Sequence, residues 1–560
     1  MRFVLRRLLA EPLLVVLITR PDAADSLGEA WGRLLSDPDR VTRVHLNGLT
    51  TEGISELLSA CGHSHVGQRV AKRLSEHTGG NPLHARALID ELGDSGLRAG
   101  GMLPAPRSFA QLTLGRLAAL DGGAVQLTTA GTVLGSSFPV ALAASLGEVD
   151  DPLAALDHAV SAGLLERAPD GHARFPHPLV RAAVYNDIPS SRLRALHLGA
   201  AASTEGARSL EHRVAAAVGS DDELAQALER RAFKEWWSGK GSIAYDHLMA
   251  AARLSSDTSA RERRLLIGVE ALFSSAEYGR AYATREIVMG CRESAHRSYI
   301  LGVIDTTPQA EVHFSAAAAA ADDKTDIPLL RLRAVGGRAV AHLHQGRFEA
   351  ALGDANSALA SGVEGWGSGL MRWVQVVSLA NLGRTTEAWD VLKQREHSQP
   401  SATELDELCA RSLLEMVDDD LPAVVKDLTA LAARARAGET RRVMEVALSV
   451  LASAQYRLGQ WDASAMSSEL AVALYGEGVP VVHAVAALVH SGRGYFDLAE
   501  DDIRSAREAD RAVPMAGGPY FVAMARAVLA QARGDLGELR AATAPLLDGQ
   551  VQPTVEGLDL

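Results

Sequence analysis

The stretch HQGRFEAALGDANSAL, residues 344–359, decides the fold because its pattern returns along the chain. Related phrases occur at 381–392 (NLGRTTEAWDVL), 457–474 (RLGQWDASAMSSELAVAL), 490–503 (HSGRGYFDLAEDDI) and 532–547 (ARGDLGELRAATAPLL). The glycines Gly346, Gly383, Gly459, Gly492 and Gly534 are 37, 76, 33 and 42 residues apart. The 76-residue gap holds MVDDDLPAVVKDLTALA, residues 416–432, as a copy with acid in place of glycine.

Two earlier positions, Gly239 and Ala276, continue the same register. A period in the thirties, with a small residue at a turn followed by alanines at helical spacing, is typical of stacked tetratricopeptide-like helix pairs. We therefore predict an α-solenoid over residues 191–550, followed by a tail at 551–560. Its tryptophans are either ligand anchors or inter-repeat core, as aromatic residues at helical spacing usually are.

Composition agrees with a mostly α-helical protein. The 560 residues are 47% hydrophobic and 22% charged, and the net charge of -13 argues against a broad surface that binds nucleic-acid phosphates. The three cysteines, Cys61, Cys291 and Cys409, form no CxxC pair, so neither a disulfide framework nor a zinc knuckle is indicated. A cytoplasmic location without a membrane partner is expected, and oligomerisation stays open.

The first eighteen residues, MRFVLRRLLAEPLLVVLI, resemble a signal peptide until Glu11 and Pro12 interrupt the apolar run. We interpret them as a helix, a turn and a buried β-strand of a parallel sheet, with secretion as the alternative. After RVTRVHLNGL, residues 40–49, the pattern becomes helical, with Thr51 available as a cap. One strand makes no sheet, so the sequence is expected to begin inside a domain.

Five motifs carry a family resemblance: LLVVLITRPD (13–22), HLNGLTTEGISELL (45–58), HTGGNPLHARALIDEL (77–92), LPAPRSFAQLTLGRLAAL (103–120) and ARFPHPLVRAAVYNDIPSSRLRALHLGAA (173–201). In this order they resemble the large LuxR-type (maltose-activator-like) transcriptional regulators, which belong to the signal-transduction ATPases with numerous domains. The resemblance implies the remnant of a P-loop α/β domain at 1–45, a helical lid at 46–104 and a winged-helix domain at 105–190, before the solenoid sensor. In that winged helix, LLERAPDGHARF would form a hairpin that turns at Asp170 and Gly171.

The sequence departs from this family in its catalytic and DNA-reading parts. No GxxxxGK[ST] motif occurs, so no Gly-rich loop and lysine are present to hold phosphates. The family uses ATP and ADP, whereas this chain is expected to bind them weakly or not at all and to be no enzyme. No C-terminal helix-turn-helix is present, and residues 107–186 carry five arginines, no lysine and seven acids. We therefore expect no direct nucleic-acid contact.

Five residues match nucleotide-contacting positions of the family. Arg20, at the end of the predicted strand, would sense the terminal phosphate, or it is a surface arginine. Gly80, Asn81 and Pro82 would place the proline near adenine, or they are a plain junction between helices. His177 would contact the diphosphate, or it caps or packs a helix. The other histidines show no metal-ligand spacing, so no metal site is assigned.

Three hypotheses follow. The chain is a truncated relative of these switch ATPases that senses a signal, as a protein or small molecule on the solenoid, and binds protein partners. Alternatively, it is an incomplete part of a full ATP-dependent, DNA-binding regulator. The third possibility is an independent tetratricopeptide scaffold.

Overall fold

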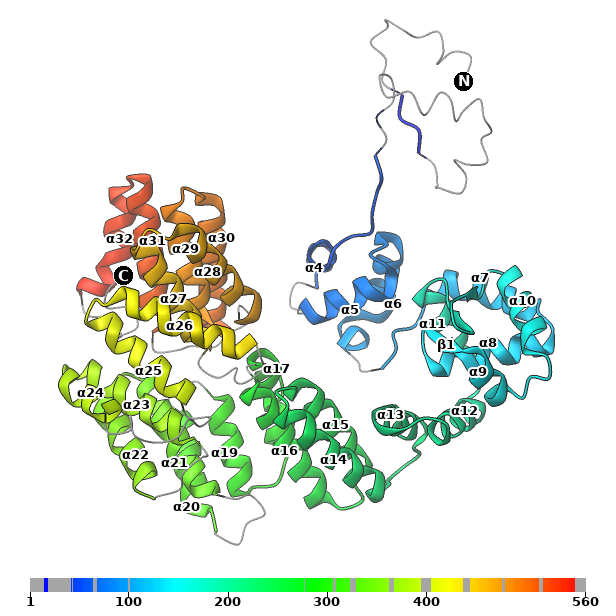
Figure 1. Cartoon of the computed structure of the whole chain (residues 1–560), viewed down its shortest axis with the longest axis horizontal. Coiled ribbons are helices and arrows are strands. Elements are labelled where there is room, and N and C mark those ends of the chain that lie inside the picture. The colour runs from blue at the N-terminus through cyan, green and yellow to red at the C-terminus, as the bar shows by residue number, and fades with distance from the viewer. Residues whose placement is uncertain are drawn as a thin grey trace, which may run out of the picture. The chain divides into compact units, whose positions relative to one another are not determined.

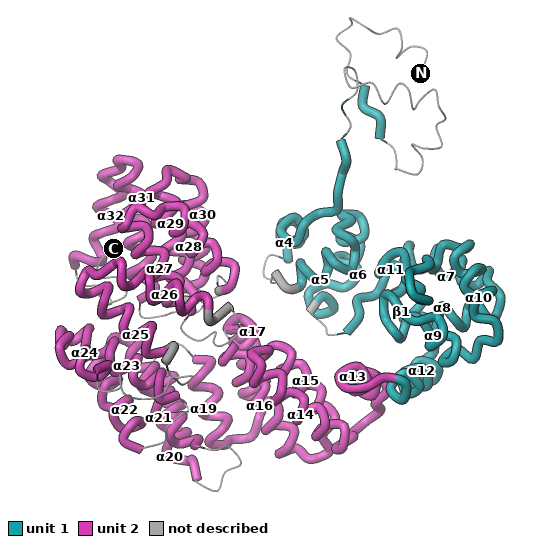
Figure 2. The backbone as a smooth tube through the Cα atoms, viewed as in Figure 1, with its two compact units in different colours: residues 1–203 teal, residues 204–560 magenta. Residues whose placement is uncertain are grey.

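The computed structural model describes residues 15–18, 42, 44–63, 68–98, 101–275, 277–305, 309–322, 329–361, 367–393, 404–436, 444–475, 479–512 and 517–548. The chain divides into two units, Met1–Ser203 and Thr204–Leu560 (Figure 2). The described residues are mostly helical, as the sequence predicts (Figure 1). The unit boundary lies one helix beyond the sequence-based boundary at 190, because α12 (Ser190–Ala202) packs on the first unit through Leu196 and Ala200.

The predicted N-terminal strand is described only at Val15–Ile18, and these residues form no strand. Their side chains are exposed, with Ile18 91% accessible. The prediction of a buried strand is therefore wrong for these four residues. An apolar run is buried in a sheet only where neighbouring strands and covering helices exist, and among the described residues of this segment none pairs with it.

Unit 1 continues with three helices, α4 (Thr51–Ala60), α5 (Gln68–Thr78) and α6 (Pro82–Arg98). The cap of α4 is Thr50, one residue earlier than predicted, because its hydroxyl accepts the Gly53 N–H at 3.2 Å. Ile54 and Leu58, at helical spacing, point into a core shared by the three helices. The predicted helix is confirmed.

The rest of unit 1 combines helices with a small sheet. Its elements are α7 (Arg107–Ala118), α8 (Gly122–Leu134), β1 (Ser137–Pro139), α9 (Val140–Gly147), α10 (Pro152–Ser161), β2 (Glu166–Arg167), β3 (His172–Arg174), α11 (Pro178–Asp187) and α12. The strand order is β1-β3-β2, all antiparallel. The predicted hairpin is present, with Asp170 (φ 55°) and Gly171 (φ 72°) in its turn. The sequence analysis missed β1, whose Phe138 is fully buried, because a strand of three residues shows no periodicity.

Unit 2 is an array of helices. They are α13 (Gly206–Ala216), α14 (Asp222–Trp237), α15 (Gly241–Leu254), α16 (Thr258–Ser274), α17 (Tyr278–Ala283), α18 (Arg285–Met289), α19 (Ala295–Ile304), α20 (Gln309–Ala320), α21 (Leu330–His344), α22 (Phe348–Ala360), α23 (Ser368–Asn381), α24 (Thr385–Lys393), α25 (Glu404–Val417), α26 (Leu421–Arg436), α27 (Met444–Arg457), α28 (Trp461–Tyr475), α29 (Pro480–Gly492), α30 (Phe496–Ala512), α31 (Gly518–Arg533) and α32 (Leu536–Leu547). Sequential helices pack as pairs, for example α21 with α22 and α27 with α28. Each pair also packs on the next, so the array is the predicted α-solenoid.

The turns inside the pairs share one backbone geometry. A residue in the left-handed region ends the first helix, and the next amide donates to the carbonyl five residues earlier, at 2.8–2.9 Å. This Schellman arrangement satisfies helix carbonyls and favours glycine, which has no Cβ. The left-handed residues of these turns are Gly239, Gly346, Gly383, Asp419, Gly459, Gly494 and Gly534, with φ from 62° to 79°.

Two of the predicted turn positions need comment, and a third lies outside the described residues. Asp419 (φ 62°) does replace glycine, as predicted. Gly492 is not the turn residue, because it ends α29 and the left-handed residue is Gly494. A Cβ on Gly492 would lie 2.2 Å from the Tyr456 hydroxyl, so that glycine permits close packing. Ala276 is the position that the structure does not describe.

Small side chains make close packing of the pairs possible. Ala339, Ala351 and Ala355 are fully buried in a cluster that extends from α21 to α29. Trp373 is buried and Trp389 half-buried in the same cluster, which favours the core interpretation for both. Trp237 and Trp461 are 88% and 51% exposed. In the part of the chain that is described, no helix has the length and apolarity needed to cross a membrane.

Candidate functional site

The turn between α5 and α6 is formed by Gly79, Gly80 and Asn81. Both glycines have positive φ, 62° and 70°, and the Gly80 amide donates to the Ser75 carbonyl at 2.9 Å, which closes α5. The Asn81 carboxamide then accepts the N–H groups of Leu83 and His84 at 3.0 and 3.3 Å and caps α6. Pro82 occupies the first position of α6, where its missing N–H costs nothing.

A second backbone segment packs directly on this turn. The Leu49 amide donates to the Gly80 carbonyl at 2.7 Å. A Cβ on Gly80 would lie 2.4 Å from the Leu49 carbonyl oxygen, and one on Gly48 would lie 2.1 Å from the Gly79 carbonyl oxygen. Only glycine fits at these positions. The segments HLNGL and HTGGNP therefore pack against each other backbone to backbone.

His177 reaches the same turn from α11. Its Nδ1 accepts the Leu179 N–H at 3.1 Å and caps α11. Its Nε2 would be 3.1 Å from a Cβ added to Gly79. The ring also lies 6.3 Å from each of the rings of His84 and Phe109, measured between centroids. Three separate stretches of unit 1 therefore meet at the Gly79–Pro82 turn.

Around the Gly79–Pro82 turn, positive charge comes from an arginine more than from the three nearby histidines. Burial lowers the pKa of His77, His84 and His177 from the usual value, and for His177 the nearby His84 lowers it further while a hydrogen bond with the Thr78 backbone opposes the shift. The three rings are thus mainly neutral at pH 7. Arg181, which donates to the Thr132 carbonyl at 2.8 Å, supplies a permanent positive charge that acts on His77.

Of the five predicted nucleotide-contacting residues, the structure brings Gly80, Asn81, Pro82 and His177 together. Arg20 lies outside the described residues. The capping alternative holds for His177 in this conformation, because it caps α11. Sequence reasoning missed His77 and His84, which flank the GGNP motif seven residues apart and could have been noticed from that spacing.

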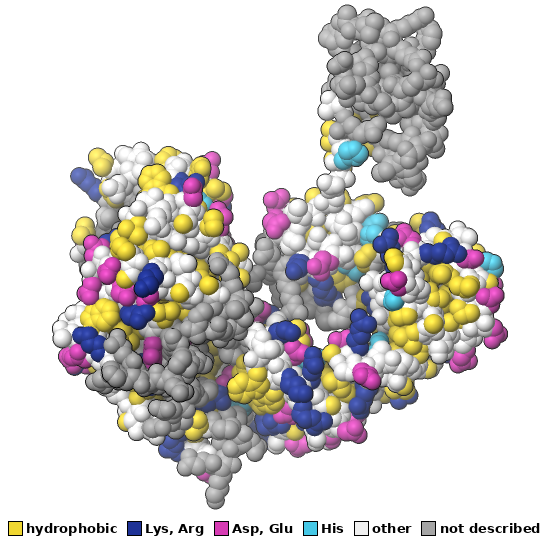
Figure 3. Space-filling view, viewed as in Figure 1, with side chains coloured by type: hydrophobic (Ala, Val, Ile, Leu, Met, Phe, Trp, Pro, Cys, Tyr) yellow, Lys and Arg dark blue, Asp and Glu magenta, His cyan; other side chains and the backbone are white. Residues whose placement is uncertain are grey.

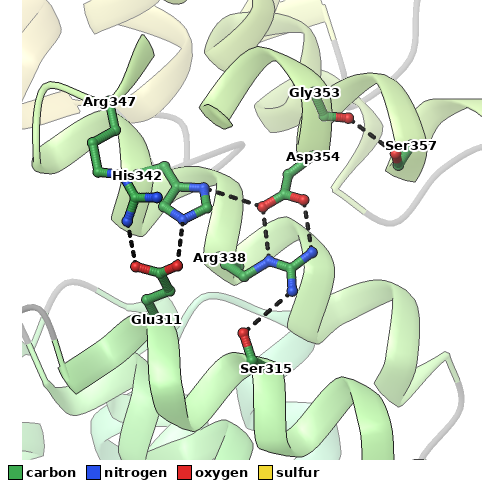
Figure 4. Close-up of polar contacts among 8 residues, drawn as sticks. All are labelled: Glu311, Ser315, Arg338, His342, Arg347, Gly353, Asp354 and Ser357. Atoms are coloured by element: carbon green, nitrogen blue, oxygen red, sulfur yellow. Dashed lines mark hydrogen bonds and ion pairs between the residues drawn. The ribbon is translucent and has the colours of Figure 1, made fainter. Parts of the chain in front are cut away.

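The solenoid contains a second polar cluster, shared by α20, α21 and α22 (Figure 4). Arg338 donates two hydrogen bonds to Asp354, at 2.7 and 2.8 Å, and one to Ser315 at 3.2 Å. His342 lies between two carboxylates, 3.2 Å from Asp354 and 3.3 Å from Glu311. Side-chain hydrogen bonds from His342 and Arg347 lower the pKa of Glu311. Every charge here has an opposite partner, which is typical of a structural network.

The described residues contain no cluster of three or more histidine, cysteine, aspartate or glutamate side chains able to hold a metal ion. On the face seen in Figure 3, cationic and anionic side chains are interspersed over unit 2. Within the part of the chain that the structure describes, the candidate ligand-contacting site is the Gly79–Pro82 turn with His177.

Comparison with known proteins gives only distant likenesses. No protein-family model matches the chain, and no curated protein matches it. Among solved structures, the chain is similar to one in the crystal structure of the APC/C hetero-tetramer Cut9-Hcn1, at 13% identity and a TM-score of 0.37, over 62% of this chain and 64% of that one. It is also similar to the signal transduction ATPase with numerous domains and a tetratricopeptide repeat sensor PH0952 from Pyrococcus horikoshii, at 12% identity and a TM-score of 0.32, over 92% of this chain and 74% of that one. Both TM-scores are below 0.5.

Proposed function

We propose that the chain is the lid, winged-helix and sensor portion of a LuxR-type, ATP-binding transcriptional regulator. Unit 2 senses the signal and binds a protein partner, and unit 1 couples this event to a nucleotide. The chain itself performs no catalysis, since it has no lysine-containing phosphate loop. Direct contact with nucleic acid is not part of the proposal.

Local structure in unit 1 supports the domain assignments. Helices α4 to α6 fall within the proposed lid at 46–104. Helices α7 to α11 and the three-stranded antiparallel sheet, with its two-stranded hairpin, fit a winged helix at 105–190. In unit 2, the exposed Trp237 and Trp461 are apolar anchors that a protein partner could bury.

One observation carries the proposal: His177 lies against the turn that contains Gly80, Asn81 and Pro82. A nucleotide diphosphate would suit such a site if the His177 N–H exchanged the Thr78 backbone for a phosphate oxygen, since an imidazole N–H and a helix N-terminus both favour anions. Nδ1 of His84 is buried and has no hydrogen-bond partner among the described residues, so a polar group remains available there. The Asn81 cap already uses two amides of α6, which fits weak binding.

Saturation-transfer NMR with millimolar ADP and the whole chain tests this function. We expect weak transfer to the adenine protons that disappears in His177→Asn, because asparagine keeps the cap of α11 but removes the imidazole. His172→Asn, in the hairpin, is the matched control and should retain the signal. Absence of transfer to the wild-type chain, or equal transfer to all three proteins, contradicts the proposal.

A further inference from the structure

Three positions recur around the left-handed turn residue of several helix pairs. They lie eight residues before, four residues before and eight residues after it. These positions hold Arg338, His342 and Asp354 in α21–α22, Arg411, Glu415 and Asp427 in α25–α26, and Arg231, Glu235 and His247 in α14–α15. The three equivalent positions therefore do not carry the same net charge in every helix pair.

In α21–α22 the three positions are balanced. The Arg338 guanidinium pairs with the Asp354 carboxylate through two hydrogen bonds, and the residue between them is a histidine (Figure 4). His342 also has Glu311 of α20 beside it, whose carboxylate pairs with Arg347. Both carboxylates of this cluster, Asp354 and Glu311, therefore have an arginine as partner.

In α25–α26 the middle position is an acid, so one guanidinium faces two carboxylates. Arg411 Nε donates to Asp427 Oδ2 at 2.7 Å, whereas Glu415 Oε1 is 3.6 Å from the same nitrogen. Only 13% of each carboxylate side chain is exposed. Glu415 Oε2 is buried and has no hydrogen-bond partner among the described residues. A buried carboxylate oxygen without a hydrogen bond makes the ionised form of the group costly.

The remaining surroundings do not compensate this charge. Asp420, in the turn, adds a further negative charge near Glu415, and Lys426 of α26 opposes it. Helices α23, α24 and α27 also pack against α25. Arg372 of α23 pairs with Glu407 at 2.9 Å, and Arg457 of α27 pairs with Asp419 at 2.6 Å. Helix α24 carries Glu387 and Asp390 and ends in Lys393.

We propose that Glu415 is a proton-binding site of the solenoid: the α25–α26 pair holds a proton on this carboxyl near neutral pH, and losing it loosens the pair. Burial, followed by the charge of Asp427, raises the pKa of Glu415 to about 7. Because this pKa lies above the unfolded value, the stabilisation is complete in acid and is lost as the pH rises through 7. The proposal does not depend on nucleotide binding.

Hydrogen exchange of the full chain at pH 6 and pH 8, corrected for intrinsic rates, tests the proposal. Amides of α25 and α26 in the wild-type chain should open several-fold more at pH 8, and a carboxyl with a pKa of about 7 sets the upper bound at about tenfold between these two pH values. Solvent screening reduces the effect below that bound. Glu415→Gln, which imitates the protonated carboxyl, should abolish the difference, and the exposed Asp390→Asn should preserve it.

Two results would overturn the proposal. One is an equal pH dependence in the wild-type chain and in Glu415→Gln. The other is faster exchange of Glu415→Gln than of wild type at pH 6, which would mean that the ionised carboxylate stabilises the pair.

Discussion

Two glycines seven residues apart should respond to alanine in opposite ways. Gly346 has φ 70° in the turn before α22, whereas Gly353 lies inside α22. A Cβ at either site would meet nothing within 4 Å, so neither substitution creates a clash. Comparing the two substitutions thus measures the effect of backbone conformation without a change in packing.

The magnitudes follow from that geometry. A left-handed alanine costs about 1–2 kcal/mol, and restricting the unfolded chain returns about 0.4–1 kcal/mol. Gly346→Ala should therefore destabilise the α21–α22 helix pair by about 1 kcal/mol. Gly353→Ala should stabilise it by about 1 kcal/mol, the difference in helix propensity between the two residues.

Hydrogen exchange is the suitable assay, because repeat arrays open locally. Amides of α21 and α22 should exchange about fivefold faster in Gly346→Ala and about fivefold slower in Gly353→Ala, the factor that corresponds to 1 kcal/mol. The reciprocal change, Asp419→Gly, should slow exchange in α25–α26, because glycine adopts the left-handed conformation without the cost of a Cβ. The exposed Arg457–Asp419 ion pair that it removes contributes little. Slower exchange in Gly346→Ala would refute the assignment of the turn geometry.

Two further substitutions test unit 1 and the solenoid network. Gly80→Ala should destabilise unit 1 by more than about 2 kcal/mol and so lower its thermal midpoint, because the added Cβ would lie 2.4 Å from the Leu49 carbonyl oxygen. An unchanged midpoint would disprove that contact. Arg338→Met should destabilise α21–α22 by up to about 3 kcal/mol in exchange experiments, since it leaves the buried Asp354 carboxylate with only His342 beside it, and adding Asp354→Leu should restore most of the loss. A double variant as unstable as the single one would contradict this.

The sequence predicts the solenoid well because its signal is physical and repeated. A left-handed turn requires glycine or a tolerant acid, and that requirement marks almost every helix pair, including the one at Asp419. The error at Gly492 arises because HSGRGYF offers two glycines, and only the structure distinguishes the packing glycine from the turn glycine.

The candidate site was predictable only in part. The residue types of Gly80, Asn81 and Pro82 predict a turn from the sequence alone. The contact of Gly48 with the Gly79 backbone depends on tertiary structure. Likewise, nothing local in the sequence places His177 against Gly79, because the two are 98 residues apart in the chain. The buried strand was predicted from apolar pattern alone, and a pattern cannot supply the neighbours that a strand requires.

Unit 2 should fold without unit 1, because each helix pair of a solenoid is stabilised by its neighbours in the array. Circular dichroism of residues 204–560 expressed alone measures this. The fragment should be predominantly helical and should unfold cooperatively on heating. Loss of helicity in the fragment would mean that the solenoid needs unit 1 to fold and would contradict the division of the chain into an independent solenoid and a separate first unit.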